Sequence, residues 1–164
     1  MFKRKVKKFE LEKTTVAGLE VITDSIIMPT ASDDSDLIPK LWEDFWSTFP
    51  RLGLKSTGRS FGVAIPLDQA TYPGKLKYLA GVEFSRGVPP GLDFKTVVIP
   101  KGNYVKYTHK GLMDNLKQSY LTAYTDWFPK LGLEMRDAPH LEVYDERFDP
   151  NSKNCEMDIL IPVK

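Results

Sequence analysis

Residues 126–144, DWFPKLGLEMRDAPHLEVY, predict the end of a helix, a turn and a strand that carries one carboxylate among apolar neighbours. The sequence FPKLGL at residues 128–133 has an earlier and fainter copy, FPRLGL, at residues 49–54. The two copies begin 128 − 49 = 79 residues apart, close to half of the 164-residue chain. This spacing predicts two copies of one structural unit, with the functional group in the second copy.

Each half of the chain first predicts a strand and then a helix. Residues 9–23 and 94–109 are rich in the β-branched and aromatic side chains that favour strands. The helical face that follows in the first half is formed by Leu37, Leu41, Phe45 and Phe49. The helical face of the second half is formed by Leu116, Tyr120, Ala123, Tyr124 and Trp127. Pro50 and Pro129 end the two helices, because a residue before proline disfavours the α-helical conformation.

A pair of strands closes each half. In the first half these strands are predicted at residues 60–66 and 76–85, and in the second half at residues 141–148 and 157–163. The breaker-rich residues 87–91, GVPPG, form a connection of about five residues between the halves. So short a connection suits two halves that pack together better than two tethered domains.

The sequence therefore predicts an α+β fold in a single domain, residues 1–164. It consists of two tandem β-α-β-β repeats, at about residues 8–86 and 93–164, related by pseudo-two-fold symmetry. Together the repeats give a mixed antiparallel sheet with two main helices and a central ligand groove.

Composition excludes several classes of protein. Apolar residues make up 41% of the chain and charged residues 27%, which is the balance of a globular domain. The net charge of +1 gives no strong field that would draw the protein to nucleic acid or to a membrane. Cys155 is the only cysteine, so no internal disulfide can form. We expect a cytoplasmic protein with no transmembrane span and no secretory signal.

Five short motifs occur in a fixed order through the second half. They are IPKGNY at residues 99–104, HKG at 109–111, YTDWFP at 124–129, PHLEVY at 139–144 and ILIPV at 159–163. This ordered set resembles the gyrase-inhibitor-like domain, which is also the AraC-type bacterial effector-binding domain. In that family the domain often follows a helix-turn-helix reader in multidrug-responsive regulators, and it also occurs alone. No DNA-binding helix pair fits before Phe9, so we expect the stand-alone form without direct nucleic-acid binding.

Glu142 is the strongest candidate for a functional residue. Strand alternation places Leu141 and Val143 on one face, which we expect under the helices, and Glu142 and Tyr144 on the other, which would line the groove. The family resemblance also implies a carboxylate in the ligand pocket at the position of Glu142. A carboxylate in an apolar groove is costly unless it is paired, and a cationic or hydrogen-bond-donating ligand would supply that partner. The alternative is a solvated residue that forms a salt bridge with a nearby lysine.

Aromatic side chains are the next candidates, because their faces offer flat apolar surface and attract cations. The residues that could line the groove are Trp42, Trp46, Tyr104, Tyr107, Trp127 and Tyr144. The alternative is that they belong to the core, which is the more frequent fate of aromatics at helical spacing.

No metal or cofactor site is expected. His109 and His140 lie on separate elements, and no further ligand occurs at metal-binding spacing. The glycines of residues 87–91 lack the pattern of a phosphate-binding loop. His140 could assist proton transfer beside Glu142.

Three functions remain open at this stage. The first is a protein that binds amphipathic, aromatic or cationic small molecules, with Glu142 as the key carboxylate. The second, which the resemblance alone implies, is a cofactor-free hydrolase of strained cyclopropanoid drugs, with Glu142 as general base and Tyr144 or Tyr104 as proton donor. The third is an interaction module with a protein partner such as DNA gyrase.

Overall fold

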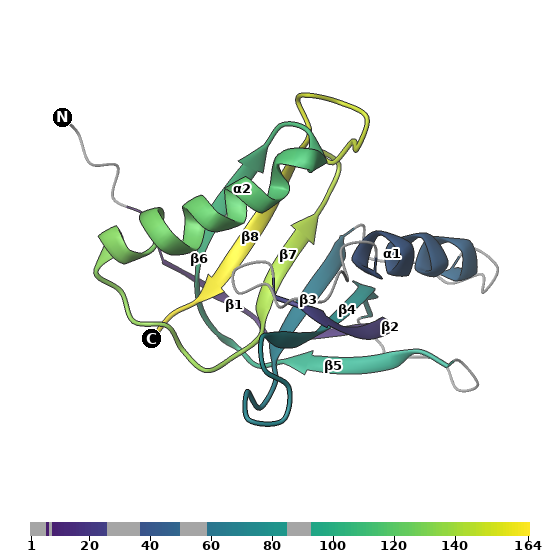
Figure 1. Cartoon of the computed structure of the whole chain (residues 1–164), viewed down its shortest axis with the longest axis horizontal. Helices are drawn as coiled ribbons and strands as arrows, with labels where there is room; N and C mark the ends of the chain where they lie inside the picture. The colour runs from purple at the N-terminus through teal and green to yellow at the C-terminus, as the bar shows by residue number, and fades with distance from the viewer. Residues whose placement is uncertain (1–5, 7, 26–36, 50–58, 85–92) are drawn as a thin grey trace.

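A computed structural model describes residue 6 and residues 8–25, 37–49, 59–84 and 93–164 (Figure 1). It contains one eight-stranded sheet in the order β1-β6-β8-β7-β3-β4-β2-β5. The strands are β1 (Phe9–Leu11), β2 (Thr14–Asp24), β3 (Ser60–Pro66), β4 (Lys75–Glu83), β5 (Lys95–Ile99), β6 (Gly102–Lys110), β7 (His140–Tyr144) and β8 (Glu156–Pro162). Every pairing between these strands is antiparallel, so the expected mixed character is absent from the described part of the sheet.

The strand order contains the predicted repeat. One half of the sheet runs β6-β8-β7 and the other runs β2-β4-β3, so β7 and β3 meet at the pseudo-two-fold axis. The edge strands are exchanged between the halves. β1 precedes β2 in sequence but pairs with β6, whereas β5 precedes β6 but pairs with β2. The prediction of two β-α-β-β repeats in an α+β fold is confirmed. The link at residues 87–91 and residues 50–54 of the first FPRLGL copy lie outside the described residues.

One core lies on the inner face of the sheet. It consists of strand residues only, namely Leu11, Val16, Phe61, Val63, Leu79, Ile99, Tyr104, Leu141, Val143 and Leu160. Leu11 belongs to β1 and Ile99 to β5, the strands at the two opposite edges of the sheet. Their presence in one cluster requires the sheet to curl, and Figure 1 shows that curl.

The helices cover the other face of the sheet. Helix α1 (Leu37–Thr48) packs through Phe45 against Ala17 of β2 and Val82 of β4. Helix α2 (Leu116–Leu121) and the turns after it lie over β6 and β8, where Met157, Ile159 and Ile161 are buried (Figure 1). The apolar stripe predicted for the first helix is therefore correct at Phe45, and Phe49 is also buried just beyond the helix.

The second helix continues further than its sequence predicted. After α2 the chain forms a π-helical segment, Thr122–Trp127, and then a 3₁₀ turn, Pro129–Leu131. Pro129 therefore begins the last turn and does not end the helix. Proline is tolerated there because its missing N–H is not needed in a first helical turn. Gly132 ends the helical stretch with φ +67°, a left-handed conformation that glycine adopts without strain.

The prediction of which strand face lies under the helices is wrong for β7. Leu141 and Val143 belong to the inner core. Glu142 pairs with Ile159 and lies on the helix-covered face, where Tyr144 also packs. Sequence alternation correctly separates the two faces but cannot assign either face, because both are apolar in a sheet that curls around its own core.

Candidate functional site

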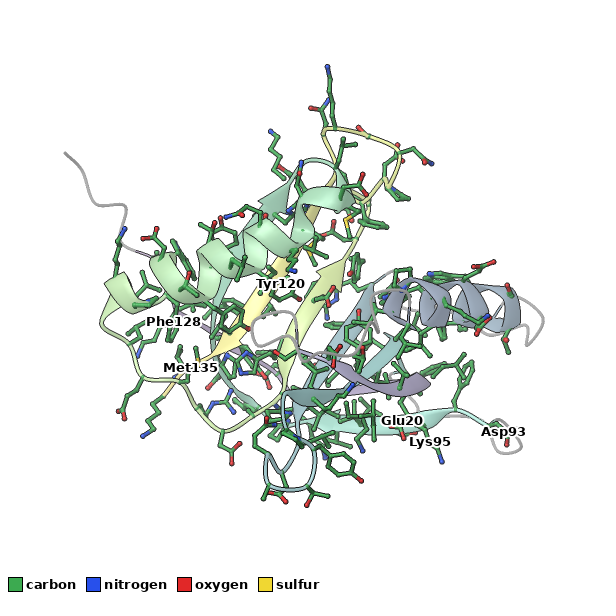
Figure 2. All side chains as sticks on the ribbon, viewed as in Figure 1. Glu20, Asp93, Lys95, Tyr120, Phe128 and Met135 are labelled. Atoms are coloured by element: carbon green, nitrogen blue, oxygen red, sulfur yellow. The ribbon has the colours of Figure 1, made fainter. Side chains whose placement is uncertain are left out.

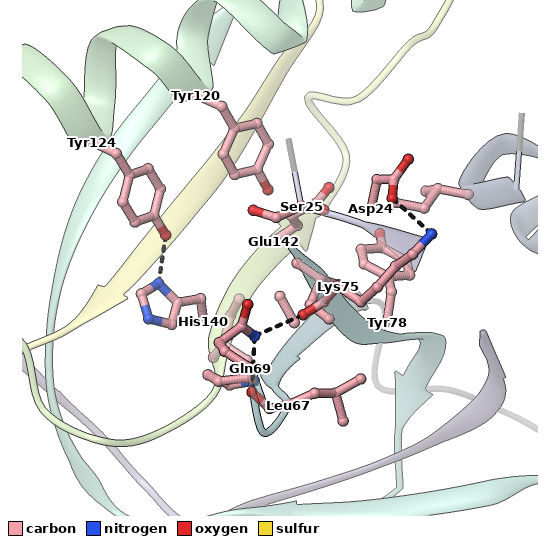
Figure 3. Close-up of a pocket in the computed structure, with 15 residues that line it drawn as sticks. Asp24, Ser25, Leu67, Gln69, Lys75, Tyr78, Tyr120, Tyr124, His140 and Glu142 are labelled. Atoms are coloured by element: carbon pink, nitrogen blue, oxygen red, sulfur yellow. Dashed lines mark hydrogen bonds and ion pairs between the residues drawn. The ribbon is translucent and has the colours of Figure 1, made fainter. Parts of the chain in front are cut away.

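A cavity of about 310 Å³ opens on the helix-covered face of the sheet, near the pseudo-two-fold axis (Figure 3). Its walls come from β2, α1, β3, β4, α2, the π-helical segment and β7, so both repeats contribute. The polar or aromatic lining residues are Asp24, Ser25, Gln69, Lys75, Tyr78, Tyr120, Tyr124, His140 and Glu142. The apolar lining residues are Ile38, Ala64, Pro66, Leu67, Leu76 and Leu141.

Glu142 lies in the middle of this wall, with only 6% of its surface exposed. The Tyr144 hydroxyl donates a hydrogen bond to its carboxylate. The hydroxyls of Tyr78 and Tyr120 also interact with the carboxylate, from β4 and α2 respectively. Tyr120 points from the helix toward the space between the two halves of the sheet (Figure 2). Three phenols from three different elements therefore surround one carboxylate.

Gly62 provides the space for this arrangement. It pairs directly with Glu142 across β3 and β7, at the centre of the sheet. A Cβ atom at Gly62 would lie 2.1 Å from the Tyr78 hydroxyl oxygen and 2.7 Å from its Cζ. Trp42 of α1 then holds this phenol from the other side, with its Nε1 donating to the Tyr78 oxygen at 2.9 Å. The phenol of Tyr78 can reach the carboxylate because the residue opposite Glu142 has no side chain.

Burial dominates the electrostatics of the site. It raises the pKa of Glu142 above its ordinary value, while hydrogen bonds from Tyr144, Tyr120 and Tyr78 act in the opposite direction. Burial also raises the pKa of Tyr78 and of Tyr120, and the negative charge of Glu142 adds to the shift. Glu142 forms no ion pair within the part of the chain that the structure describes. The lysine of the cavity, Lys75, pairs instead with Asp24 at 2.8 Å.

His140 and Tyr124 form a second polar pair beside Glu142. The Tyr124 hydroxyl lies 2.5 Å from His140 Nδ1, and the two rings stack with their centroids 5.6 Å apart. Tyr120 stacks on Tyr124 at 6.1 Å, which makes one continuous aromatic wall along the helix. Burial lowers the pKa of His140 to about 4, so the imidazole is neutral at physiological pH.

The structure brings together some of the predicted site residues and separates others. Tyr144 stands behind Glu142, and Trp42 contacts Tyr144 with ring centroids 5.2 Å apart. Trp46 is 44% exposed on α1. Tyr107 and Trp127 pack on each other at 5.2 Å beneath the helical segment.

Tyr104 is buried in the inner core, where its hydroxyl donates to the Pro139 carbonyl at 2.9 Å. Of the predicted site residues only Glu142 lines the cavity, and the six that do not are Trp42, Trp46, Tyr104, Tyr107, Trp127 and Tyr144.

Sequence reasoning missed Tyr78, Tyr120 and Tyr124 as site residues. Tyr120 and Tyr124 were already on the predicted helical face, and their spacing of four residues puts both on one wall. Tyr78 carried no comparable signal, because its position depends on β4 being separated from β7 by a single strand, β3.

Within the described residues no group of three or more His, Cys, Asp or Glu side chains could hold a metal ion. None of the described helices has the length and apolar character needed to cross a bilayer.

The described residues thus form a curled antiparallel sheet with two helices on one face and a cavity on that same face (Figure 1). The model of the family described as the GyrI-like small molecule binding domain matches residues 4–164. The chain belongs to this family, so the resemblance found in its sequence is confirmed.

Among curated proteins the chain is similar to the transcriptional regulator BrlR of Pseudomonas aeruginosa, with 30% identity over 137 residues. The match covers 80% of this chain and 48% of BrlR, so the chain spans about half the length of that regulator.

Solved structures show the same fold at lower identity. The structure of SAV2435 bound to tetraphenylphosphonium has a TM-score of 0.72 at 18% identity, covering 97% of this chain and 93% of that one. The C-terminal domain of EcmrR has a TM-score of 0.67 at 18% identity, covering 98% of this chain and 97% of that one. The same fold occurs in the EcmrR–DNA complex, of which the match covers 57% of the EcmrR chain.

Proposed function

We propose that this protein is an effector-binding protein whose cavity takes amphipathic, aromatic cations, with Glu142 as the group that neutralises the ligand charge. The observation that carries this proposal is a buried carboxylate without an ion-pair partner among the described residues, placed in a cavity of aromatic and aliphatic side chains. An unpaired buried charge is unfavourable, and a lipophilic cation offsets that cost without a large loss of its own hydration.

The aromatic lining supports the choice of a cation with a broad apolar body. Tyr78, Tyr120 and Tyr124 present ring surfaces to the cavity, and such rings attract cations by roughly 0.5–2 kcal/mol each. The three phenols near Glu142 also keep it hydrogen-bonded before a ligand enters, so binding needs no rearrangement of the carboxylate. The tetraphenylphosphonium bound to SAV2435, which shares the fold, is a ligand of this chemical class.

The test is calorimetric titration of tetraphenylphosphonium into the wild-type protein and into Glu142→Gln. The glutamine keeps the shape of the side chain and removes its charge, so we expect the affinity to fall more than tenfold. Glu146→Gln is the matched control, because Glu146 is an exposed residue four positions along the chain and its loss removes the same charge. Equal affinities for wild type and Glu142→Gln would refute the role of this carboxylate.

The same samples separate binding from turnover. If the protein only binds the ligand, mass spectrometry of the recovered ligand should show an unchanged mass. A panel of cyclopropanoid electrophiles, incubated with wild type and Glu142→Gln, tests the hydrolase alternative in the same way. Product that forms with wild type and not with the variant would replace the binding proposal with a catalytic one.

A further inference from the structure

The Tyr124–His140 pair is a second polar feature of the same cavity, separate from the phenols around Glu142. Tyr124 comes from the π-helical segment and His140 from the start of β7. His140 and Glu142 lie two residues apart on one strand and both line the cavity (Figure 3). Two residues of a strand span on the order of 6–7 Å, a separation at which the two groups can contact different parts of one ligand.

The contacts of Tyr124 favour one direction for this hydrogen bond. Its hydroxyl has no other acceptor within the described residues, and a contact of 2.5 Å is typical of an O–H donor. Tyr124 therefore donates to Nδ1 of His140. A neutral imidazole that accepts at Nδ1 carries its proton at Nε2, so Nε2 is a hydrogen-bond donor.

That donor is open. No hydrogen bond of His140 Nε2 occurs in the described part of the chain. The described residues also contain no buried side-chain nitrogen or oxygen that lacks a partner. An unpartnered Nε2 must therefore have contact with solvent, and His140 is one of the residues that line the cavity.

The groups around His140 keep its imidazole neutral at neutral pH. The titratable groups that line the cavity with it come from five elements: Glu142 of β7, Tyr120 of α2, Tyr124 of the π-helical segment, Lys75 and Tyr78 of β4, and Asp24 of β2. Lys75 and Asp24 pair with each other, which leaves Glu142 as the nearby unpaired charge. The imidazole itself is neutral, with a pKa of about 4.

We propose that His140 donates a hydrogen bond from Nε2 to an acceptor oxygen on the ligand, and so selects cations that carry an ether, carbonyl or hydroxyl group on an apolar arm. This inference rests on the proposed function, since it assumes that the cation itself lies against Glu142. The Tyr124 hydroxyl acts as a positioning group, because it holds the imidazole in the tautomer that donates.

The experiment uses two matched series of triphenylphosphonium ions. One series carries ω-methoxyalkyl arms with one to four methylene groups, and the other carries alkyl arms of equal length in which CH₂ replaces the ether oxygen. The measured quantity is the ratio of the two dissociation constants at each arm length, obtained by calorimetry for wild type, His140→Phe, His140→Gln and Tyr124→Phe.

We expect one arm length at which wild type favours the ether, relative to His140→Phe, by about fivefold, the effect of one neutral hydrogen bond. His140→Gln keeps a donor and should retain part of this preference. Tyr124→Phe should reduce the preference, because both imidazole tautomers are then populated. A purely structural role of His140 would weaken both series together and leave the ratio unchanged.

The outcomes separate this inference from the proposal on which it rests. If both series bind but their ratio is the same in wild type and in all three variants, the role of His140 is refuted and the cation site stands. If no phosphonium ion binds to the wild-type protein, both ideas are refuted. If His140→Phe does not fold, the ratio in Tyr124→Phe decides, and an unchanged ratio there counts against the inference.

Discussion

The two central strands of the sheet, β7 and β3, are related by the pseudo-two-fold axis, yet they carry opposite kinds of side chain. Their direct pairs are His140 with Ala64, Glu142 with Gly62 and Tyr144 with Ser60. In each of these three pairs the large polar side chain belongs to β7 and the small side chain belongs to β3. The backbones of the two strands are symmetric but their side chains are not. The small residues of β3 leave space opposite the large polar residues of β7, and the cavity depends on this difference.

The difference also shows how the first repeat takes part in the site. Since β3 presents almost nothing to the cavity, Tyr78 of the next strand, β4, extends over Gly62 and reaches Glu142. The first repeat thus supplies a phenol from one strand further out, together with Lys75 and Ile38. The second repeat carries the carboxylate, but the cavity around it belongs to both repeats.

The largest effect is expected from Gly62→Ala. This change places a side chain on β3 directly opposite Glu142 of β7, where the difference between the two strands matters most. The added methyl group would lie 2.1 Å from the Tyr78 hydroxyl oxygen, so the phenol must move away from Glu142. Overpacking of this kind costs about 1–3 kcal/mol, and we expect binding of tetraphenylphosphonium to weaken about thirtyfold. Calorimetry measures the affinity, and circular dichroism shows whether the variant is folded.

Tyr78→Ala supplies the control for that experiment. Once the ring of Tyr78 is absent, the methyl group of Gly62→Ala has no phenol to displace, so the double variant should bind like Tyr78→Ala alone. Two independent effects that simply add would contradict this explanation.

A smaller effect is expected from Tyr144→Phe, which keeps the ring on β7 and removes one hydroxyl from the carboxylate. A hydrogen bond to a charged group contributes about 1.5–3 kcal/mol, part of which the other two phenols can replace. We expect a loss of affinity of about tenfold in calorimetry with tetraphenylphosphonium. Tyr72→Phe is the matched control, because Tyr72 is exposed in the turn before β4. An affinity equal to wild type would show that the Tyr144 hydroxyl is dispensable.

Much of the fold could be predicted from local patterns. Helical spacing located Phe45 and Phe49 in the core, and alternation with turn residues located the strands at residues 60–66 and 157–163 within a few positions. The 79-residue repeat anticipated the symmetry of the sheet. The helices and strands could be predicted because their patterns depend on residues close together in sequence, and the repeat could be predicted because its two copies share a motif.

The arrangement of the site depends on long-range register and could not be predicted in the same way. Glu142 and Tyr144 carried a local signal because alternation places them on one strand face. Tyr78 reaches Glu142 only because β4 lies beside β3, and because Gly62 falls opposite the carboxylate in the register. The exclusion of Tyr104 from the cavity likewise follows from the curl of the sheet, which turns its strand face toward the inner core.

The smallest effect concerns the stability of the protein without ligand. Burial raises the folded-state pKa of Glu142 above 4.5, so between 4.5 and that raised pKa the folded state holds more protons than the unfolded state. The free energy of unfolding must therefore fall as the pH rises through this window, by about 1.4 kcal/mol for each unit of difference between the two pKa values. Glu142→Gln lacks this dependence, so its stability relative to wild type should increase from about pH 4.5 upward and then level off.

His140, with its pKa lowered to about 4, has the opposite dependence between pH 4 and 6.5, but it is present in both proteins and cancels in the difference. Urea unfolding of the two proteins at intervals from pH 4 to 8 measures this difference, and a value independent of pH would mean that Glu142 is ionised in the folded protein as readily as in the unfolded chain.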